Sequence, residues 1–141
     1  MQHNEMIGKV QAIAGLPDRG SAERATGAVL RTLGERVAPG LAEHVAAQLP
    51  PDLGAHLRAA ARDAARDGRA RSAGERFDLP VFAGRVSGRA AVPDDAAVRD
   101  SAAVLEVLDA ALSPELMDKV AADLSADLGE LLPAGRAAGP A

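Results

Sequence analysis

Apolar residues recur every three or four positions along most of this chain, which is the spacing of amphipathic helices. Rows of this kind run through residues 6–14, 22–37, 41–49, 98–112 and 116–124. No segment alternates apolar and polar residues with the period of two that is typical of a half-buried strand. The pattern therefore predicts an all-α protein.

Prolines and acidic residues mark the places where helices are expected to begin. Pro39 and Pro114 fit the first turn of a helix, where a proline is tolerated because that N–H would be unpaired anyway. Asp78, and Asp94 or Asp95, precede further apolar rows and are expected to act as N-cap residues. Between these breaks the chain reads as one four-helix unit followed by another.

The second half of the chain repeats the first. Residues 24–57 and 99–132 align without a gap at an offset of 75, and 15 of these 34 positions are identical. The match extends toward the N-terminus at an offset of 76, where residues 6–10 resemble residues 82–86. The sequence therefore predicts a compact helical bundle of two similar four-helix halves, a tandem internal repeat with a pseudo-two-fold relation.

The repeat also sets the predicted domain organisation. Residues 1–132 are expected to form a single all-helical domain, with repeat one at 3–67, a joint at 68–77 and repeat two at 78–132. Each repeat alone, at roughly 65 residues, would bury too little surface for high stability, so we expect the two to pack together. Residues 133–141 are rich in Pro, Gly and Ala and are expected to be a disordered tail.

Composition narrows the function classes. The chain has no cysteine, which excludes disulfides, thiolate catalysis and Cys-ligated zinc. It has no signal peptide pattern and no run of 18 apolar residues, so we expect a cytoplasmic protein with no membrane partner. The net charge of −4 and an aromatic content of only Phe77 and Phe82 argue against nucleic-acid binding.

Searches for catalytic chemistry find no signature. The chain lacks G-x-G-x-x-G, P-loop, G-x-S-x-G and H-E-x-x-H motifs, so no catalytic, cofactor-binding or metal-binding residue is assigned and no cofactor is expected. A metal site joining Glu43, His44 and His56 is conceivable. However, His44 aligns with Lys119 and is expected to face solvent, and His56 aligns with Leu131 and is expected to be partly buried where the repeats meet. The many acidic residues of the second half are interpreted as a solvated surface.

Two charged positions are identical in both repeats: Arg24 with Arg99, and Asp52 with Asp127. We expect structural roles for them near helix starts, with pairing between Arg and Asp as one option. An exposed pair of this kind contributes at most about 1 kcal/mol.

A third group of charges is the arginine-rich tract that runs from Arg58 to Arg71. Its main interpretation is a solvated helix face followed by a linker. The alternative is an interaction patch for an acidic partner, with Arg58, Arg62 and Arg66 as its candidate residues.

The chain resembles the bacterial domain of unknown function 2267 family. The resemblance rests on the spacing of apolar residues and helix breaks in Asn4–Ile7, Leu30–Arg36, Leu41–Pro50, Glu75–Leu79 and Ala103–Leu112. It implies a compact all-α domain of two similar helical halves in a bacterial cytoplasm. The family has no established activity, so it implies no functional residue. Met6 and Pro80 depart from its usual pattern, at the expected starts of the first helix of each repeat.

These features lead to three functional hypotheses. The first is a non-enzymatic helical protein-interaction or regulatory module that binds an unknown protein partner. The alternative is a small-ligand-binding or hydrolytic protein with its site between the two repeats. The weakest is nucleic-acid binding through the Arg58–Arg71 tract.

Overall fold

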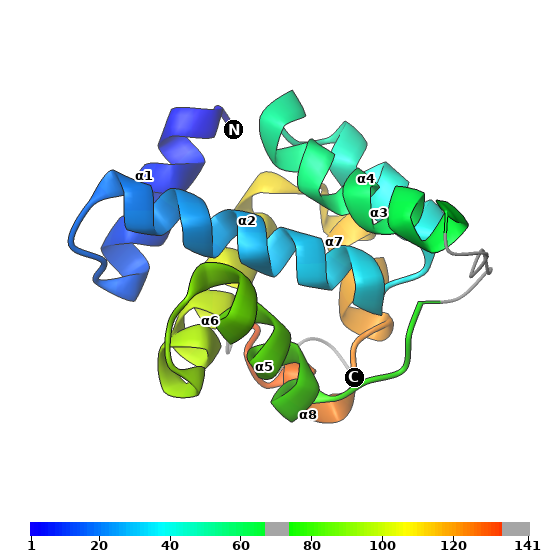
Figure 1. The fold of residues 1–141 in the computed structure, drawn as a ribbon. Helices are drawn as coiled ribbons and strands as arrows, with labels where there is room; N and C mark the ends of the chain where they lie inside the picture. Colours follow the sequence, from blue (N-terminus) through cyan, green and yellow to red (C-terminus); the bar gives the residue numbers. More distant parts are fainter. Residues whose placement is uncertain (67–73, 134–141) are drawn as a thin grey trace.

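The computed structural model describes residues 1–66 and 74–133, and these residues form eight α-helices and no strand (Figure 1). The helices are α1 His3–Ala14, α2 Arg19–Arg36, α3 Pro39–Ala47, α4 Pro51–Arg66, α5 Leu79–Ala90, α6 Asp94–Ala111, α7 Pro114–Ala122 and α8 Ala126–Gly129. The predicted all-α fold is confirmed. Within the two described ranges no helix is both long and apolar enough to cross a bilayer. The predicted disordered tail beyond Pro133, and most of the predicted joint, lie outside the described residues.

Most helices begin where the local sequence indicates. Pro39 and Pro114 occupy the first turns of α3 and α7. Ahead of α2, the carboxylate of Asp18 accepts a hydrogen bond from the Ser21 N–H at 2.7 Å, which satisfies one of the unpaired donors of the first turn. Ser113 caps α7 in the same way by accepting from the Leu116 N–H.

Two predicted caps differ in the structure. The N-cap of α6 is Pro93, and Asp94 and Asp95 lie inside its first turn, where their charge favours the positive end of the helix dipole. Asp78 occupies the N-cap of α5, but its side chain makes no capping hydrogen bond. The Leu79 N–H donates instead to Asp127, which is far away in the sequence.

Helix α2 lies at the centre of the molecule. It packs against α1 and α4 of the first half and also against α5 and α6 of the second (Figure 1). Leu30 and Leu33 of α2 and Leu105 and Leu108 of α6 are at most 1% exposed, as is Phe82 of α5. Because these side chains from both halves pack together, the two halves share one hydrophobic core. Each such side chain contributes about 2 to 3 kcal/mol by leaving water.

Small residues let these helices approach one another closely. A Cβ added to Gly34 of α2 would lie 2.8 Å from the Leu57 carbonyl oxygen of α4. Such a contact is shorter than van der Waals packing allows, so any larger residue would push α4 away from α2. Glycine at this position therefore permits the close approach of α2 and α4.

The two halves match in their first three helices and differ in the fourth. The helices α1, α2 and α3 have 12, 18 and 9 residues, and α5, α6 and α7 have the same lengths. In contrast, α4 has 16 residues and packs along α2 and α3, whereas α8 has four. The helix order thus agrees with the sequence repeat, while a pseudo-two-fold relation between the halves stays a prediction.

Candidate functional site

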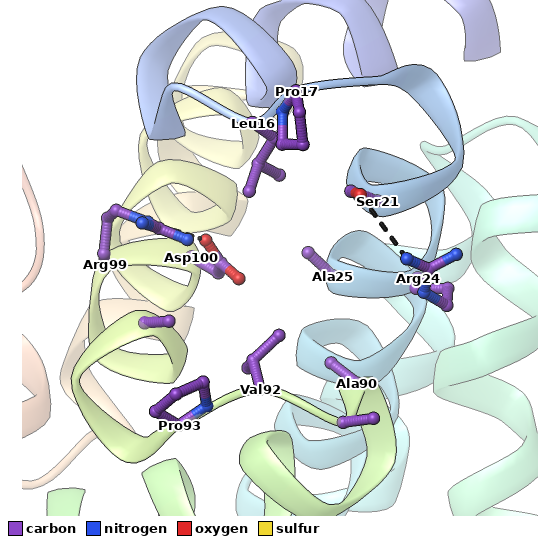
Figure 2. Close-up of a pocket in the computed structure, with 12 residues that line it drawn as sticks. Leu16, Pro17, Ser21, Arg24, Ala25, Ala90, Val92, Pro93, Arg99 and Asp100 are labelled. Atoms are coloured by element: carbon purple, nitrogen blue, oxygen red, sulfur yellow. Dashed lines mark hydrogen bonds and ion pairs between the residues drawn. The ribbon is translucent and has the colours of Figure 1, made fainter.

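A cavity of about 530 Å³ lies between the first turns of α2 and the first turns of α6 (Figure 2). The turn from α1 to α2 forms one end and the turn from α5 to α6 forms the other, so both halves of the chain contribute to it. Its volume falls within the range of roughly 300–1,000 Å³ that is typical of small-molecule sites.

The lining residues come in pairs that are equivalent in the sequence repeat. Pro17 and Pro93 line the cavity at an offset of 76, and Arg24 and Arg99 line it at an offset of 75. Three further pairs differ between the halves, namely Leu16 with Val92, Ser21 with Ala96, and Ala25 on α2 with Asp100 on α6. The repeat therefore places two arginines in one cavity, and a single acidic residue makes its two walls chemically different.

Two left-handed helix ends shape the turns at this cavity. Gly15 ends α1 with φ of 67°, and Ala91 ends α5 with φ of 58°. A residue with a Cβ occupies this conformation at a cost of about 1 to 2 kcal/mol, so the Ala91 turn is held by its surroundings. Its N–H donates to the Ser87 carbonyl oxygen, and the Ser87 hydroxyl donates to the Val92 carbonyl oxygen.

Asp100 is the buried acid of the cavity. Its side chain is 1% exposed, and its Oδ1 accepts a hydrogen bond from Arg99 Nε at 3.1 Å. Its other carboxylate oxygen, Oδ2, is buried and has no hydrogen-bond partner in the described part of the chain. Figure 2 shows the carboxylate extending from α6 toward the space between the two helices. A buried carboxylate oxygen without a donor is energetically unfavourable, and such groups are rare in native proteins.

The two arginines retain unused hydrogen-bonding capacity. Arg24 is exposed, and one of its terminal nitrogens donates to Ser21 Oγ over a long distance of 3.4 Å. The side chain of Arg99 is 48% exposed and pairs with Asp100 through Nε. Because a guanidinium has five N–H donors in a planar fork, both side chains can still bind a carboxylate or a phosphate group.

The repeated aspartates lie elsewhere. Asp127 accepts hydrogen bonds from the Leu79 N–H, the Leu128 N–H and the Ser125 hydroxyl. The hydrogen bond from Ser125, followed by those from the backbone, lowers the pKa of Asp127 below its usual value. Asp127 thereby connects α8 to the start of α5, whereas Asp52 is exposed in the first turn of α4. In the described structure neither aspartate pairs with Arg24 or Arg99.

The arginines of the predicted interaction patch lie along α4, away from the cavity. Arg58 donates to both carboxylate oxygens of Glu43 at 3.0 Å, and this hydrogen bonding lowers the pKa of Glu43. Arg66 lies 3.5 Å from Asp63, and Arg62 is exposed. Two of the three candidate arginines are thus partly neutralised. The remainder of the predicted Arg58–Arg71 tract, from residue 67 on, lies outside the described residues.

The histidines form no metal site in the described residues, where no group of three or more suitable side chains converges. His44 is exposed on α3, as its alignment with Lys119 indicates. His56 is exposed on one side, and its ring covers Gly27, where an added Cβ would lie 2.9 Å from Cε1. It therefore lies between α4 and α2 of the first half and not where the repeats meet, and partial burial of its ring lowers the pKa of His56.

Asp100 is the residue that sequence reasoning missed, because it was included in the solvated acidic surface. One signal was available. Asp100 follows Ala97 by three residues and precedes Val104 by four, so it shares the buried face of α6 with them. Asp100 is thus an acidic residue on an apolar helix face, and the other repeat has an alanine at the equivalent position. Packing of the core therefore does not require a charge there.

Comparison with known proteins identifies the family and no function. No curated protein matches this chain. A family model described as an uncharacterized conserved protein (DUF2267) matches residues 3–131, which includes every described helix. The chain therefore belongs to the DUF2267 family of uncharacterized conserved proteins.

Proposed function

We propose that this protein is a non-enzymatic module that binds a small anionic molecule in the cavity between α2 and α6. The observation that supports the proposal best is that Arg24 and Arg99 line one cavity while much of their hydrogen-bonding capacity is unused. Guanidinium groups bind carboxylate and phosphate groups through paired, charge-assisted hydrogen bonds, which are about twice as strong as neutral ones.

The surroundings of the arginines favour ligand binding over structural pairing. Neither arginine is closed off by a bidentate acid, in contrast to Arg58 with Glu43. Leu16 and Val92 give the cavity apolar ends. An apolar cavity with a few well-placed polar groups is the usual form of a small-molecule site.

We place the module in the cytoplasm, which fits a chain without cysteine. Binding of a protein partner at Arg58, Arg62 and Arg66 stays a separate prediction from the sequence. In our proposal, the molecule bound in the cavity regulates the interaction of this protein with its partner.

The test is a thermal-unfolding titration with inorganic phosphate, acetate and succinate at constant ionic strength. A ligand that binds the folded state raises the unfolding midpoint in a saturable way. We expect at least one probe to do so with the wild-type chain and none with the double variant Arg24→Gln/Arg99→Gln. Arg62→Gln, which removes an exposed arginine of α4, is the matched control and should respond like the wild type. A response that survives in the double variant would exclude this cavity as the site.

A further inference from the structure

We propose that the ligand of this cavity is a zwitterion, in which an anionic group binds Arg24 and Arg99 and a protonated amine binds Asp100 Oδ2. The inference rests on the proposed function, because both groups would occupy the same cavity. It adds the chemical class of the ligand, which the two arginines alone do not define.

The first support is the state of Asp100. Its side chain is 1% exposed, and Oδ2 is buried without a hydrogen-bond donor in the described structure. Arg99 reaches only Oδ1, through Nε. An ammonium group carries three donors and a positive charge, so it would supply both the hydrogen bond and the charge that this oxygen lacks.

The second support is that the fold does not need an acid at this position. In the first repeat the equivalent residue is Ala25, which is 2% exposed and lines the same cavity. An alanine therefore suffices for packing at this level of the helix pair. Burying the Asp100 carboxylate costs free energy that packing does not require, which points to a role in binding.

The third support is the arrangement of charge across the cavity. Figure 2 shows Ser21 and Arg24 extending from α2 and Asp100 extending from α6 on the opposite wall. A molecule that spans the cavity would meet the Arg24 guanidinium on one side, and on the other side the Asp100 carboxylate together with the Arg99 guanidinium that pairs with its Oδ1. Leu16 and Val92 border the space between them, and they fit a short aliphatic segment that separates the two charges.

The experiment compares ligands that differ only in the amine. The probes are ω-amino acids from glycine to 6-aminohexanoate and the alkanoates of matching length, with ω-aminoalkyl phosphates and alkyl phosphates as a second pair of series. Affinities are measured by NMR titration of the isotopically labelled full chain, and the Asp100 carboxyl carbon is followed directly. The two series distinguish a carboxylate from a phosphate as the anionic group.

We expect the amine to improve binding about tenfold or more at the best-matched length, which is the effect of one charge-assisted hydrogen bond in a sheltered site. The Asp100 carboxyl signal should shift with the amino compound and not with its amine-free partner. Asp100→Asn and Asp100→Ala should remove the preference and still bind the amine-free anion. Asp95→Asn changes an exposed acid of the same helix and should keep the preference.

Each other result has a definite meaning. Equal affinity of the wild type for amino and amine-free probes would overturn the zwitterion and leave the anion-binding function standing. A preference that persists in both Asp100 variants would also overturn it. If no probe of any series binds, both proposals fail. Should one Asp100 variant not fold, the wild-type preference and the Asp100 carboxyl signal still decide.

Discussion

Two of the polar places where the halves of the described molecule meet differ in how completely their charges are paired. One is the α2–α5 seam, which comprises Thr32, Glu35, Glu75, Arg85 and Arg89. Glu35 accepts from Arg85 and Arg89 through Oε1 and from Arg89 through Oε2. Arg85 also binds both oxygens of Glu75, and Arg89 donates to Thr32 Oγ1.

The other place is the cavity between α2 and α6, where arginine and acidic side chains have incomplete sets of hydrogen-bond partners. Arg24 has one long hydrogen bond to a hydroxyl, and Asp100 has one carboxylate oxygen without a donor. A polar network contributes to stability when its members are satisfied, whereas an unsatisfied buried member weakens the fold. The comparison indicates that the seam contributes to holding the halves together, whereas the charged groups of the cavity are incompletely paired.

The largest expected effect comes from Arg36, which extends the paired region. It is 3% exposed, and it donates to the Phe77 carbonyl at 2.7 Å and to the Asp123 carbonyl at 2.8 Å. Arg36→Met would leave the Phe77 oxygen without this donor, so we expect the free energy of unfolding to fall by about 2 to 3 kcal/mol. Urea denaturation measures the change, and Arg62→Met is the control. A loss below that of the control would contradict the importance of the paired region.

The next effect tests the seam through pH. Burial by itself raises the pKa of Glu35, but the hydrogen bonds and charges of Arg89 and Arg85 outweigh it, so this pKa lies below its ordinary value of 4.5. A carboxylate with a lowered pKa stabilises the fold above the pKa of the unfolded state and loses that contribution as pH falls through the folded-state pKa.

We therefore expect Glu35→Gln to lower the free energy of unfolding by about 1 kcal/mol at pH 7, with a smaller loss as pH falls below the ordinary carboxyl pKa of 4.5. Denaturation curves at several pH values for the wild type and the variant measure this difference. Glu106→Gln removes an exposed acid of α6 and serves as control. A loss that stays constant down to acidic pH would mean that the Glu35 charge is not responsible.

A change of opposite sign is expected in the cavity. Asp100→Ala introduces the residue that the first repeat already has at this position, and it removes a buried carboxylate oxygen without a donor. The half-exposed Arg99 remains able to bind water. The free energy of unfolding should rise by about 1 kcal/mol while the preference for the amino compound is lost, which is the usual trade between stability and function. Destabilisation comparable to that of Arg36→Met would place Asp100 among the structural charges.

The smallest effect on stability is expected among the cavity arginines. Arg24→Gln should change the free energy of unfolding by less than about 0.5 kcal/mol, because Arg24 is exposed and makes one long hydrogen bond. Arg99→Gln also removes the cation that pairs with the buried Asp100, so its effect on stability should be larger than that of Arg24→Gln. Each should nevertheless weaken anion binding about tenfold. Thermal unfolding and titration of the same samples provide both values. If stability fell and binding did not, the structural role first expected for these residues would hold.

What could be predicted from the sequence was what neighbouring residues determine. The helix bounds follow from apolar spacing, from Gly15 and from prolines such as Pro39 and Pro114, whose effects are local. The repeat also selected Arg24 and Arg99 as unusual positions, although it did not place them in one cavity.

The remaining features depend on contacts between distant segments. The Leu79 N–H is bound by Asp127, 48 residues away, although Asp78 stands next to it. His56 covers Gly27 because of the way α4 crosses α2, and Asp100 is buried because α1, α2 and the α5–α6 turn enclose the start of α6. The spacing of apolar residues along one helix does not show which other helix it packs against.

Because the cavity lies between the two halves, binding of the proposed ligand would also strengthen their association. One wall belongs to α2 and the other to α6, so neither half of the chain carries a complete site. A ligand that touches both walls would add its binding free energy to the association of the halves, and motion that separates α2 from α6 would release it. Occupancy of the cavity would then report how firmly the two halves are docked, and a partner that senses their separation would in effect sense the concentration of the ligand.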